Sequence, residues 1–232
     1  MKLLLVAATW MEVNLLVDEL EKVEEKSHLL KTYRLGDTQI DILISGIGLT
    51  FTTFHLTSTL HQDKYDMVIN FGIAGSLTHQ LAIGEVVNVV YEEFADLGTE
   101  TPNEFLTLFE SGFIDINEFP FENGILKASG VLEWDEMKKV RGITVNKSYR
   151  NSECISKILA KFSGHTETME GAAVFYVCNW LGIECYQIRA ISHYIEPNDS
   201  SKWNIPLALD NLKHSLIEHL KHLKVVVEQN NP

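Results

Sequence analysis

The chain opens with six apolar residues in a row, Leu3-Leu4-Leu5-Val6-Ala7-Ala8. A continuous apolar run of this length is typical of a central strand that is covered on both faces. The segment from Met11 to Lys26 follows, and its apolar residues recur at the spacing of a helix. These apolar residues are Val13, Leu16, Val17, Leu20 and Val23. The start of the chain therefore predicts a strand followed by a helix.

Strand-like and helix-like segments continue to alternate along the chain. Further strands are expected at 33–35, 39–44, 67–70, 85–91, 141–145 and 184–191, with a turn at Gly36-Asp37 between the first two. Further helices are expected at 50–61, near 152–162, at 169–181 and at about 206–227. This alternation predicts an α/β fold in which a largely parallel or mixed sheet lies between helices. Such folds bind their ligands at the carboxyl ends of the strands.

Length and composition suit one globular unit. The 232 residues are 45% hydrophobic, which is enough for a sizeable core, and we expect a single domain over 1–232. The segment at about 92–135 lacks clear periodicity and contains Pro102, Pro120 and many aromatic residues, so we expect an insertion over one end of the sheet. Nineteen basic and 32 acidic residues give a net charge of −13 without a dense Lys/Arg block, which argues against a nucleic-acid partner.

The three cysteines, Cys154, Cys178 and Cys185, form an odd set without CxxC or His/Cys ligand spacing. Neither a disulfide framework nor a zinc site is therefore expected, and the chain is interpreted as a reduced, cytoplasmic protein. The apolar run at the start is too short, and too soon followed by Glu12 and Asp18, for a signal peptide or a membrane span. We expect no membrane association.

Two motifs in the last third of the chain contain the most informative charged residues. Thr168-Met169-Glu170-Gly171-Ala172-Ala173 is followed, about one helix and one strand later, by Arg189-Ala190-Ile191-Ser192-His193. Glu170 has two interpretations. It is either an acidic residue that is favoured at the start of a helix by the helix dipole, or a buried carboxylate that binds a ligand, because burial of a carboxylate requires a partner. The same two alternatives hold for Glu12, which follows the first predicted strand.

Together with Asn70-Phe71-Gly72-Ile73-Ala74-Gly75, these motifs resemble those of the superfamily of purine nucleoside phosphorylases and methylthioadenosine nucleosidases. Within it, the chain is most similar to the futalosine hydrolases of menaquinone biosynthesis, and the likeness extends from Glu12 to Asn204. The resemblance implies a three-layer α/β/α sandwich with a mixed central sheet. It also implies an enzyme that hydrolyses the N-glycosidic bond of futalosine, releases hypoxanthine and uses no metal or organic cofactor.

The resemblance assigns roles to the charged residues. Glu12 would orient and deprotonate the attacking water, and Glu170 would accept hydrogen bonds from the ribose hydroxyls while Met169 packs against the sugar. Both carboxylates would stabilise the positive charge of an oxocarbenium-like transition state. Arg189 would support the catalytic carboxylate and the water; without the resemblance, it is equally well a buried ion-pair partner.

A wider set of residues is expected to line the nucleoside. The glycine segments Gly46-Ile47-Gly48 and Gly72-Ile73-Ala74-Gly75 either let the backbone approach a ligand or simply make tight turns. The resemblance implies that the backbone of Gly142-Ile143-Thr144-Val145-Asn146-Lys147 flanks the purine. The benzoate of futalosine would need an aromatic wall, for which Trp203 and Tyr194 are the candidates, and a donor, for which Lys202 or Arg150 is the candidate. The expected substrate-binding residues are Ile47, Gly48, Ile73, Ala74, Gly75, Val145, Asn146, Met169, Tyr194 and Trp203.

His193 departs from the patterns of both groups of relatives. By the resemblance, adenine-releasing enzymes carry Asp at this place and futalosine hydrolases carry Asn. Hypoxanthine has a carbonyl at C6 where adenine has an amino group, so a donor at position 193 suits a 6-oxopurine. Ile73, where methylthioadenosine nucleosidases tend to carry Ser, also separates the chain from the adenine-releasing group.

Three alternatives stay open: a methylthioadenosine/adenosylhomocysteine nucleosidase, a nucleoside phosphorylase, and a non-catalytic purine nucleoside sensor. The phosphorylase is disfavoured because Glu12 stands in the first loop, where phosphate would need Arg-rich or Gly-rich donors. The resemblance further implies a homodimer or higher homo-oligomer, in which loops of a neighbouring subunit complete the site. Candidate contact residues in the insertion are Phe94, Phe105, Phe109 and Phe113.

Overall fold

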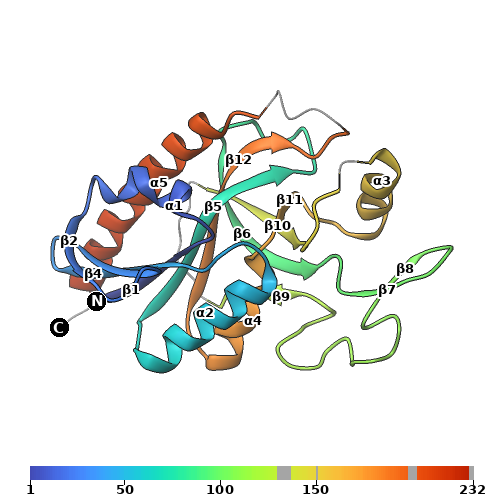
Figure 1. Cartoon of the computed structure of the whole chain (residues 1–232), viewed down its shortest axis with the longest axis horizontal. Helices are drawn as coiled ribbons and strands as arrows, with labels where there is room; N and C mark the ends of the chain where they lie inside the picture. The colour runs from blue at the N-terminus through green and yellow to red at the C-terminus, as the bar shows by residue number, and fades with distance from the viewer. Residues whose placement is uncertain (130–136, 150, 198–202, 230–232) are drawn as a thin grey trace.

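The computed structural model describes residues 1–129, 137–149, 151–197 and 203–229. Its strands (Figure 1) are β1 (Lys2–Ala7), β2 (Glu21–Glu25), β3 (Leu30–Leu35), β4 (Thr38–Ile44), β5 (Met67–Ser76), β6 (Val86–Phe94), β7 (Gly98–Glu100), β8 (Phe105–Thr107), β9 (Leu126–Lys127), β10 (Lys138–Thr144), β11 (Thr166–Thr168) and β12 (Cys185–Tyr194). Its helices are α1 (Trp10–Val17), α2 (Leu49–Gln62), α3 (Ser152–Lys161), α4 (Gly171–Leu181) and α5 (Ile205–Gln229).

One mixed sheet organises the fold, in the order β11-β10-β6-β12-β5-β1-β4-β3-β2, with β9 paired to β6. β1 is parallel to β4 and β5, and β5 is parallel to β12, whereas β6 is antiparallel to β12. β11 also pairs with β5, so the pairing closes β5, β12, β6, β10 and β11 into a ring. The predicted α/β fold with a mixed central sheet is confirmed.

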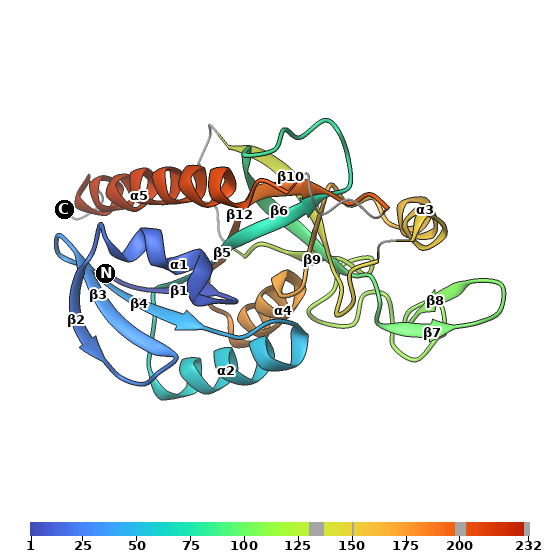
Figure 2. The ribbon, with the colours of Figure 1, turned by 45° about the horizontal axis from the view of Figure 1, so that its top comes forward.

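Helices cover both faces of the sheet, with α1 and α5 on one face and α2 and α4 on the other (Figure 2). Leu3 and Leu5 of β1 enter the core with α1 and α5, whereas Leu4 and Val6 enter the core with α2 and α4. Burial on both faces explains the continuous apolar run at the start of the chain. Among the helices in the described part of the chain, none is long and apolar enough to span a bilayer.

The helix predicted over 11–26 is wrong in its second half. α1 ends at Val17, and residues 21–25 form β2, an edge strand antiparallel to β3. All residues of β2 are exposed, including Val23, which fitted the helical spacing. Pairing with β3, rather than burial of an apolar face, sets the conformation of residues 21–25. An exposed edge strand of this kind needs no alternation of apolar and polar residues, so the sequence does not reveal it.

Two strands extend beyond their predicted ends at residues 70 and 191. Residues 72–76 continue β5, because β12 pairs with them on one side and β11 pairs with the last two on the other. Residues 192–194 likewise belong to β12. Glycine has low strand propensity, so it is the pairing with neighbouring strands that keeps residues 72–75 extended. β11 itself was not expected, and α4 begins at Gly171 rather than Met169.

The segment at about 92–135, described as far as residue 129, begins inside β6 and then leaves the main sheet. Its strands β7 and β8 form a separate hairpin. Three of the four phenylalanines expected at a subunit contact have partners within the chain. Phe94 and Phe109 each pack edge-to-face against Phe121, and Lys161 lies over the ring of Phe105. Phe113 is 72% exposed.

Candidate active site

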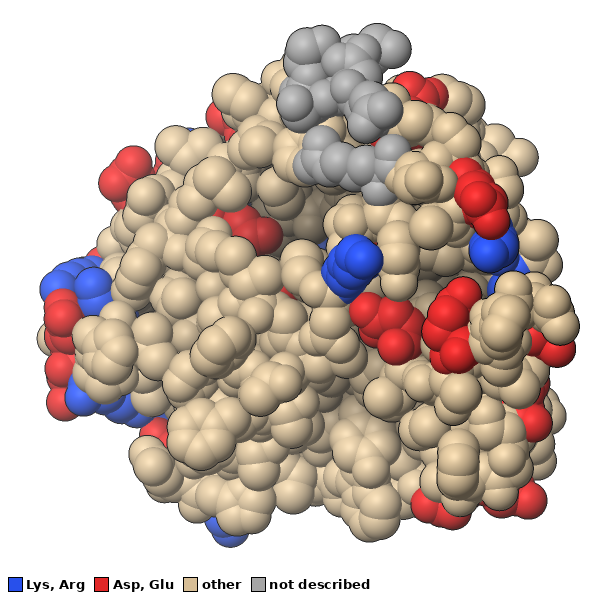
Figure 3. All heavy atoms as spheres, turned by 45° about the vertical axis from the view of Figure 1, so that its right-hand side comes forward, with Lys and Arg blue, Asp and Glu red and all other residues tan. Residues whose placement is uncertain are grey.

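The segments that contain the predicted site residues meet at one edge of the sheet. β1, β4, β5 and β12 are parallel, so their carboxyl ends lie on the same side (Figure 1). Residues 46–48 follow β4 and residues 72–75 end β5, and these two strands flank β1. Seen from this side, the surface is hollowed (Figure 3).

Glu12, the third residue of α1, is buried and held by backbone N–H groups. Its Oε2 accepts from Ala8 and Thr9 at 3.1 Å each, and its Oε1 accepts from Ile73 at 3.1 Å. The bond from Thr9 is a helix-capping contact, but Ile73 lies in β5, far from this helix in sequence. Burial raises the pKa of Glu12, against the opposing effects of Arg189 and of the N–H donors. A carboxylate in this state is suited to take a proton from water.

Glu170 lies directly before α4 and is 5% exposed. Its side chain makes no capping bond with its own helix; the hydroxyl of Thr168 accepts the N–H of Gly171 instead, at 3.2 Å. Oε1 of Glu170 accepts the N–H of Gly48 at 3.0 Å, and Oε2 lies 3.9 Å from Nη2 of Arg189. Gly48 has a φ of 92°, which favours glycine. Helix capping therefore does not explain Glu170.

Arg189, which is 1% exposed, lies between these carboxylates. Its Nη2 donates to Oδ1 of Asn70 and, at 3.3 Å, to Oε1 of Gln187. A Cβ on Gly72 would lie 2.6 Å from Nη1 of Arg189 and 2.3 Å from Oε1 of Glu12. The missing side chain at position 72 therefore lets the guanidinium and the carboxylate approach the same stretch of β5.

Sequence reasoning missed a third buried carboxylate, Glu92 of β6. Its Oε1 accepts from Nε2 of Gln187 at 2.6 Å, and its Oε2 accepts from Oγ1 of Thr144 at 2.9 Å. Burial raises the pKa of Glu92 to about 7. One signal was available for its partner. Gln187 stands two residues before Arg189 in the same strand, so their side chains share a face, and a buried amide on that face needs a hydrogen-bond partner.

His193 lies at the carboxyl end of β12. The hydroxyl of Ser192 donates to the carbonyl of Ala74 at 3.2 Å, so its single proton is in use. The 2.9 Å contact between Ser192 Oγ and Nδ1 of His193 is then one in which the ring nitrogen donates. The ring of Trp203 stacks on that of His193, with centroids 3.8 Å apart. Nε2 therefore accepts a hydrogen bond when the ring is neutral and donates one when it is protonated.

Two of the residues expected around the benzoate of the substrate, Tyr194 and Trp203, have contacts within the chain. The hydroxyl of Tyr194 donates to the carbonyl of Leu81 at 3.0 Å. Trp203 is engaged in the stacking described above. Lys202 and Arg150, the expected donors, lie outside the described residues.

The remaining predicted binding residues lie close to the glycine segments. Val145 is buried directly after β10, and Oδ1 of Asn146 accepts the N–H of Leu49, next to Gly48, at 3.2 Å. Ile47 is 54% exposed and Met169 is half-buried. These contacts link the segment after β10 to the start of α2, on the same side as Glu170.

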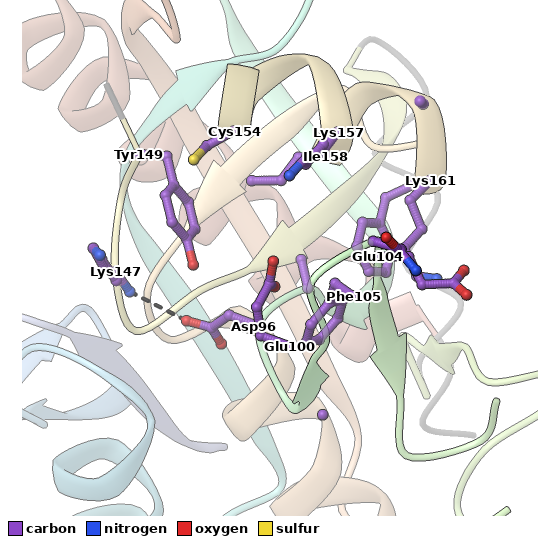
Figure 4. A pocket seen from close by; sticks show the side chains of 15 residues that line it. Asp96, Glu100, Glu104, Phe105, Lys147, Tyr149, Cys154, Lys157, Ile158 and Lys161 are labelled. Carbon is purple, nitrogen blue, oxygen red and sulfur yellow. Dashed lines mark hydrogen bonds between the residues drawn. The ribbon is translucent and has the colours of Figure 1, made fainter. Parts of the chain in front are cut away.

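A separate hollow of about 670 Å³ lies between the β7–β8 hairpin, residues 147–149 and α3 (Figure 4). None of the four predicted catalytic residues lines it. Its charged lining residues are Asp96, Glu100, Glu104, Lys147, Lys157 and Lys161. Oδ2 of Asp96 accepts the N–H groups of Asn146 and Lys147, at 2.5 and 3.2 Å. Asp96 lines this hollow and at the same time holds residues 146 and 147, which border the candidate active site.

The model of the phosphorylase superfamily matches residues 2–226. The chain belongs to the phosphorylase superfamily. It is 29% identical to the 5'-methylthioadenosine/S-adenosylhomocysteine nucleosidase of Buchnera aphidicola, over 94% of this chain and 97% of the relative. It is 27% identical to the futalosine hydrolase of Thermus thermophilus, over 78% of this chain and 81% of the relative.

A solved structure shows the same fold. The S-adenosylhomocysteine nucleosidase of Streptococcus pyogenes matches with a TM-score of 0.79 at 20% identity, covering 96% of this chain and 97% of that one. The predicted superfamily and the predicted class of enzyme, a nucleosidase that hydrolyses N-glycosidic bonds, are confirmed. The two sequence relatives are named for different substrates at similar identity, so identity does not separate the substrates.

Proposed function

We propose that this nucleosidase hydrolyses futalosine and releases hypoxanthine, as a step of menaquinone biosynthesis. The observation that carries the proposal is His193, whose ring is oriented by Ser192 and Trp203 at the carboxyl end of β12. With Nδ1 engaged, a protonated His193 donates from Nε2. Such a donor suits O6 or N7 of hypoxanthine, whereas adenine presents an amino group at C6.

The buried carboxylates account for hydrolysis. Glu12 takes a proton from a water molecule directed at C1′, and Glu170 accepts hydrogen bonds from the ribose hydroxyls. As the bond to the base breaks, positive charge develops on the sugar, and both carboxylates stabilise it. Arg189 reduces the repulsion between the two acids, because its guanidinium lies near both. His193 assists the departure of the base.

A methylthioadenosine/adenosylhomocysteine nucleosidase is the main alternative. It is favoured by the Buchnera relative, which matches 94% of this chain. It also has a physical basis, since a neutral His193 would accept a hydrogen bond from the amino group of adenine. Adenine nucleosides therefore belong in the first assay.

The test is to incubate the enzyme with futalosine, inosine and methylthioadenosine, with and without phosphate, and to separate the released bases by chromatography. We expect free hypoxanthine at the same rate in both buffers, and faster release from futalosine than from inosine. Preferential cleavage of methylthioadenosine would contradict the proposal. Strict dependence on phosphate would identify a phosphorylase, and binding of nucleosides without release of a base would identify a sensor.

We also propose that the active form is a homodimer or higher homo-oligomer. α2 and α4 pack against each other and expose Phe51, Phe54 and Trp180 by 59, 66 and 52%. Exposed large apolar side chains gathered in one layer are typical of an interaction surface. Light scattering should give a multiple of the 26.3 kDa chain mass, and a monomeric mass at assay concentration would contradict this.

A further inference from the structure

The side chain of Glu92 in β6 is 0% exposed, so any part that it has in the reaction is indirect. Its two carboxylate oxygens accept hydrogen bonds from different strands, Oε1 from Gln187 of β12 and Oε2 from Thr144 of β10. Both partners are buried as well. Each of them has a second hydrogen bond, which leads toward the candidate active site.

Gln187 connects Glu92 to Arg189. Its Nε2 donates to Glu92 at 2.6 Å, and its Oε1 accepts from Nη2 of Arg189 at 3.3 Å. Arginine has only donors and an ionised carboxylate has only acceptors, so this orientation of the amide satisfies both. The amide of Asn70 also accepts from Nη2, but its own Nδ2 donates to the backbone carbonyl of Val6. Of these two amides, one is thus oriented by a neutral group and the other by Glu92.

Thr144 connects Glu92 to the start of α4. The hydroxyl of Thr144 accepts the N–H of Ala172 at 2.8 Å and donates to Oε2 of Glu92 at 2.9 Å. Ala172 is the second residue of α4, and Glu170 stands directly before this helix. The two hydrogen bonds of Glu92 therefore lead to Arg189 and to the backbone after Glu170, two residues whose charged groups lie 3.9 Å apart.

Two glycines make room for Glu92. A Cβ on Gly142 would lie 2.5 Å from Oε1 of Glu92, and a Cβ on Gly171 would lie 2.1 Å from the same atom and 2.3 Å from Oε1 of Gln187. A larger residue at either position would displace the carboxylate or the amide. Gly171 directly follows Glu170, so the backbone beside this catalytic residue is fitted to Glu92 and Gln187.

We propose that Glu92, in its ionised form, is a positioning residue for the hydrolysis. It acts through Gln187 on Arg189, and through Thr144 on the start of α4. The inference rests on the proposed roles of the two catalytic carboxylates and adds the group that keeps their surroundings in place. A negative charge beyond the amide of Gln187 strengthens the hydrogen bond from Arg189, because hydrogen bonds in a chain polarise one another. Arg189 then stays near both catalytic carboxylates, where it reduces their repulsion.

The electrostatics of Glu92 allow this role to be tested by pH. Burial raises the pKa of its carboxyl group to about 7, against the lowering effects of Gln187, Thr144 and the charge of Arg189, and the charge of Glu170 adds to the raising effect. About one tenth of Glu92 is therefore ionised at pH 6 and about nine tenths at pH 8. The positioning effect should grow between these two values.

Charged side chains on the strands beside β6 are paired with other acids. Arg141 of β10 donates to Glu93 at 3.2 Å, and Lys127 of β9 forms an ion pair with Glu122. α4, which packs against β6, contains no Asp, Glu, Lys, Arg or His. Within the described part of the chain, the charges of Arg189 and Glu170 are thus the ones that act on Glu92.

The experiment measures kcat and KM at pH 6 and 8, with the nucleoside that the wild-type enzyme cleaves fastest. Glu92→Gln keeps the shape of the side chain and removes its charge. At pH 8, it should lower kcat by about tenfold, as expected for one charge-assisted hydrogen bond, and leave KM within about threefold. At pH 6, where Glu92 of the wild-type enzyme is mostly protonated, kcat of the two proteins should differ by less than about threefold.

The matched control is Glu93→Gln, which removes the half-buried acid that pairs with Arg141 and should keep the wild-type kcat at both pH values. The titrations of Glu12 and His193 are common to all of these proteins, so the ratio of kcat values at each pH reports on Glu92. Gln187→Met is the second variant, and it also serves if Glu92→Gln does not fold. It retains Glu92 but removes the amide before Arg189, and it should lower kcat by about tenfold at pH 8.

Two results would overturn the inference. One is a ratio of wild-type to Glu92→Gln kcat that is the same at pH 6 and pH 8. The other is wild-type kcat at pH 8 in a folded Gln187→Met protein. Failure of the wild-type enzyme to cleave futalosine would count against the proposed substrate alone, because the variants are compared on whichever nucleoside is cleaved fastest.

Discussion

The two ends of the candidate active site are built from different kinds of contact. At the sugar end, Glu12 and Glu170 accept backbone N–H groups from the segments after β1 and β4 and from β5, and both lie near Arg189. At the proposed base end, Nδ1 of His193 contacts the hydroxyl of Ser192, and the ring stacks on that of Trp203. One end is therefore fixed by main chain, and the other by side chains.

The difference has a consequence for substrate choice. Backbone N–H groups are present whatever the side chains are, so the sugar end keeps its chemistry when neighbouring residues change. Side chains at the base end can be exchanged one at a time, which changes the preferred base without rebuilding the groups that act on water and ribose. Relatives named for different purine nucleosides at similar identity fit this division.

The largest effect is expected at the sugar end, from Glu12→Gln. Turnover should fall about 10²- to 10⁴-fold, because the amide cannot take a proton from water, while nucleoside binding stays largely intact. Single-turnover kinetics and equilibrium binding check this. Glu19→Gln, which removes an exposed acid paired with Lys213, serves as control and should leave turnover unchanged. Near-normal turnover in Glu12→Gln would show that Glu12 only caps α1 and does not act as the base.

A smaller loss, about ten- to a hundredfold in turnover, is expected from Glu170→Ala. Hydrogen bonds from the ribose hydroxyls strengthen as positive charge develops on the sugar, so turnover should fall more than substrate affinity. Measuring kcat and Kd for the same nucleoside separates the two. Wild-type kinetics in this variant would show that the bond from Gly48 to Glu170 is structural only.

At the base end, His193→Asn and His193→Asp form a matched pair. Asn still donates to O6 or N7, so activity on futalosine should stay within a few fold. An ionised Asp would face the carbonyl of hypoxanthine, and hypoxanthine release should fall about tenfold or more while some adenine release is gained. Both bases are quantified for all three proteins. Equal behaviour of the two variants would remove His193 from base recognition.

The smallest effect concerns Glu92, which supports the sugar end through Gln187. Its pKa of about 7 in the folded protein lies above the ordinary 4.5, so the folded state binds the proton more tightly. The resulting stabilisation is complete below pH 4.5 and is lost as the pH rises through 7. Between pH 6 and 8, this group alone lowers the free energy of unfolding by about 1.4 kcal/mol.

Glu92→Gln should abolish that pH-dependent loss, and Glu93→Gln should retain it. Urea unfolding of the wild-type protein and the two variants at pH 6 and 8 measures the difference directly. If the wild-type protein and Glu92→Gln lose the same amount of stability over this range, Glu92 is not the group that titrates.

A strand that is buried on both faces gives a continuous apolar run in the sequence, and a helix that is buried on one face gives apolar residues at helical spacing. Elements with one of these two patterns were predictable. The run at 3–8 predicted β1, and the apolar spacing at 50–61 predicted α2. The edge strand β2 and the glycine-rich end of β5 show neither pattern, because pairing with other strands keeps them extended. The sequence therefore predicted a helix over β2 and ended the predicted strand at residue 70, before the glycine-rich end of β5.

The sequence by itself determined the superfamily and singled out Glu12, Glu170 and Arg189, because they stand in motifs of fixed local spacing. Tertiary structure alone decided what those carboxylates bind and which further acids join them. The N–H of Gly48 reaches Glu170 across 122 residues, and Gln187 of β12 links Glu92 of β6 to Arg189. Whether a buried carboxylate is paired depends on residues of neighbouring strands. The register between those strands cannot be predicted from any one local segment of the sequence.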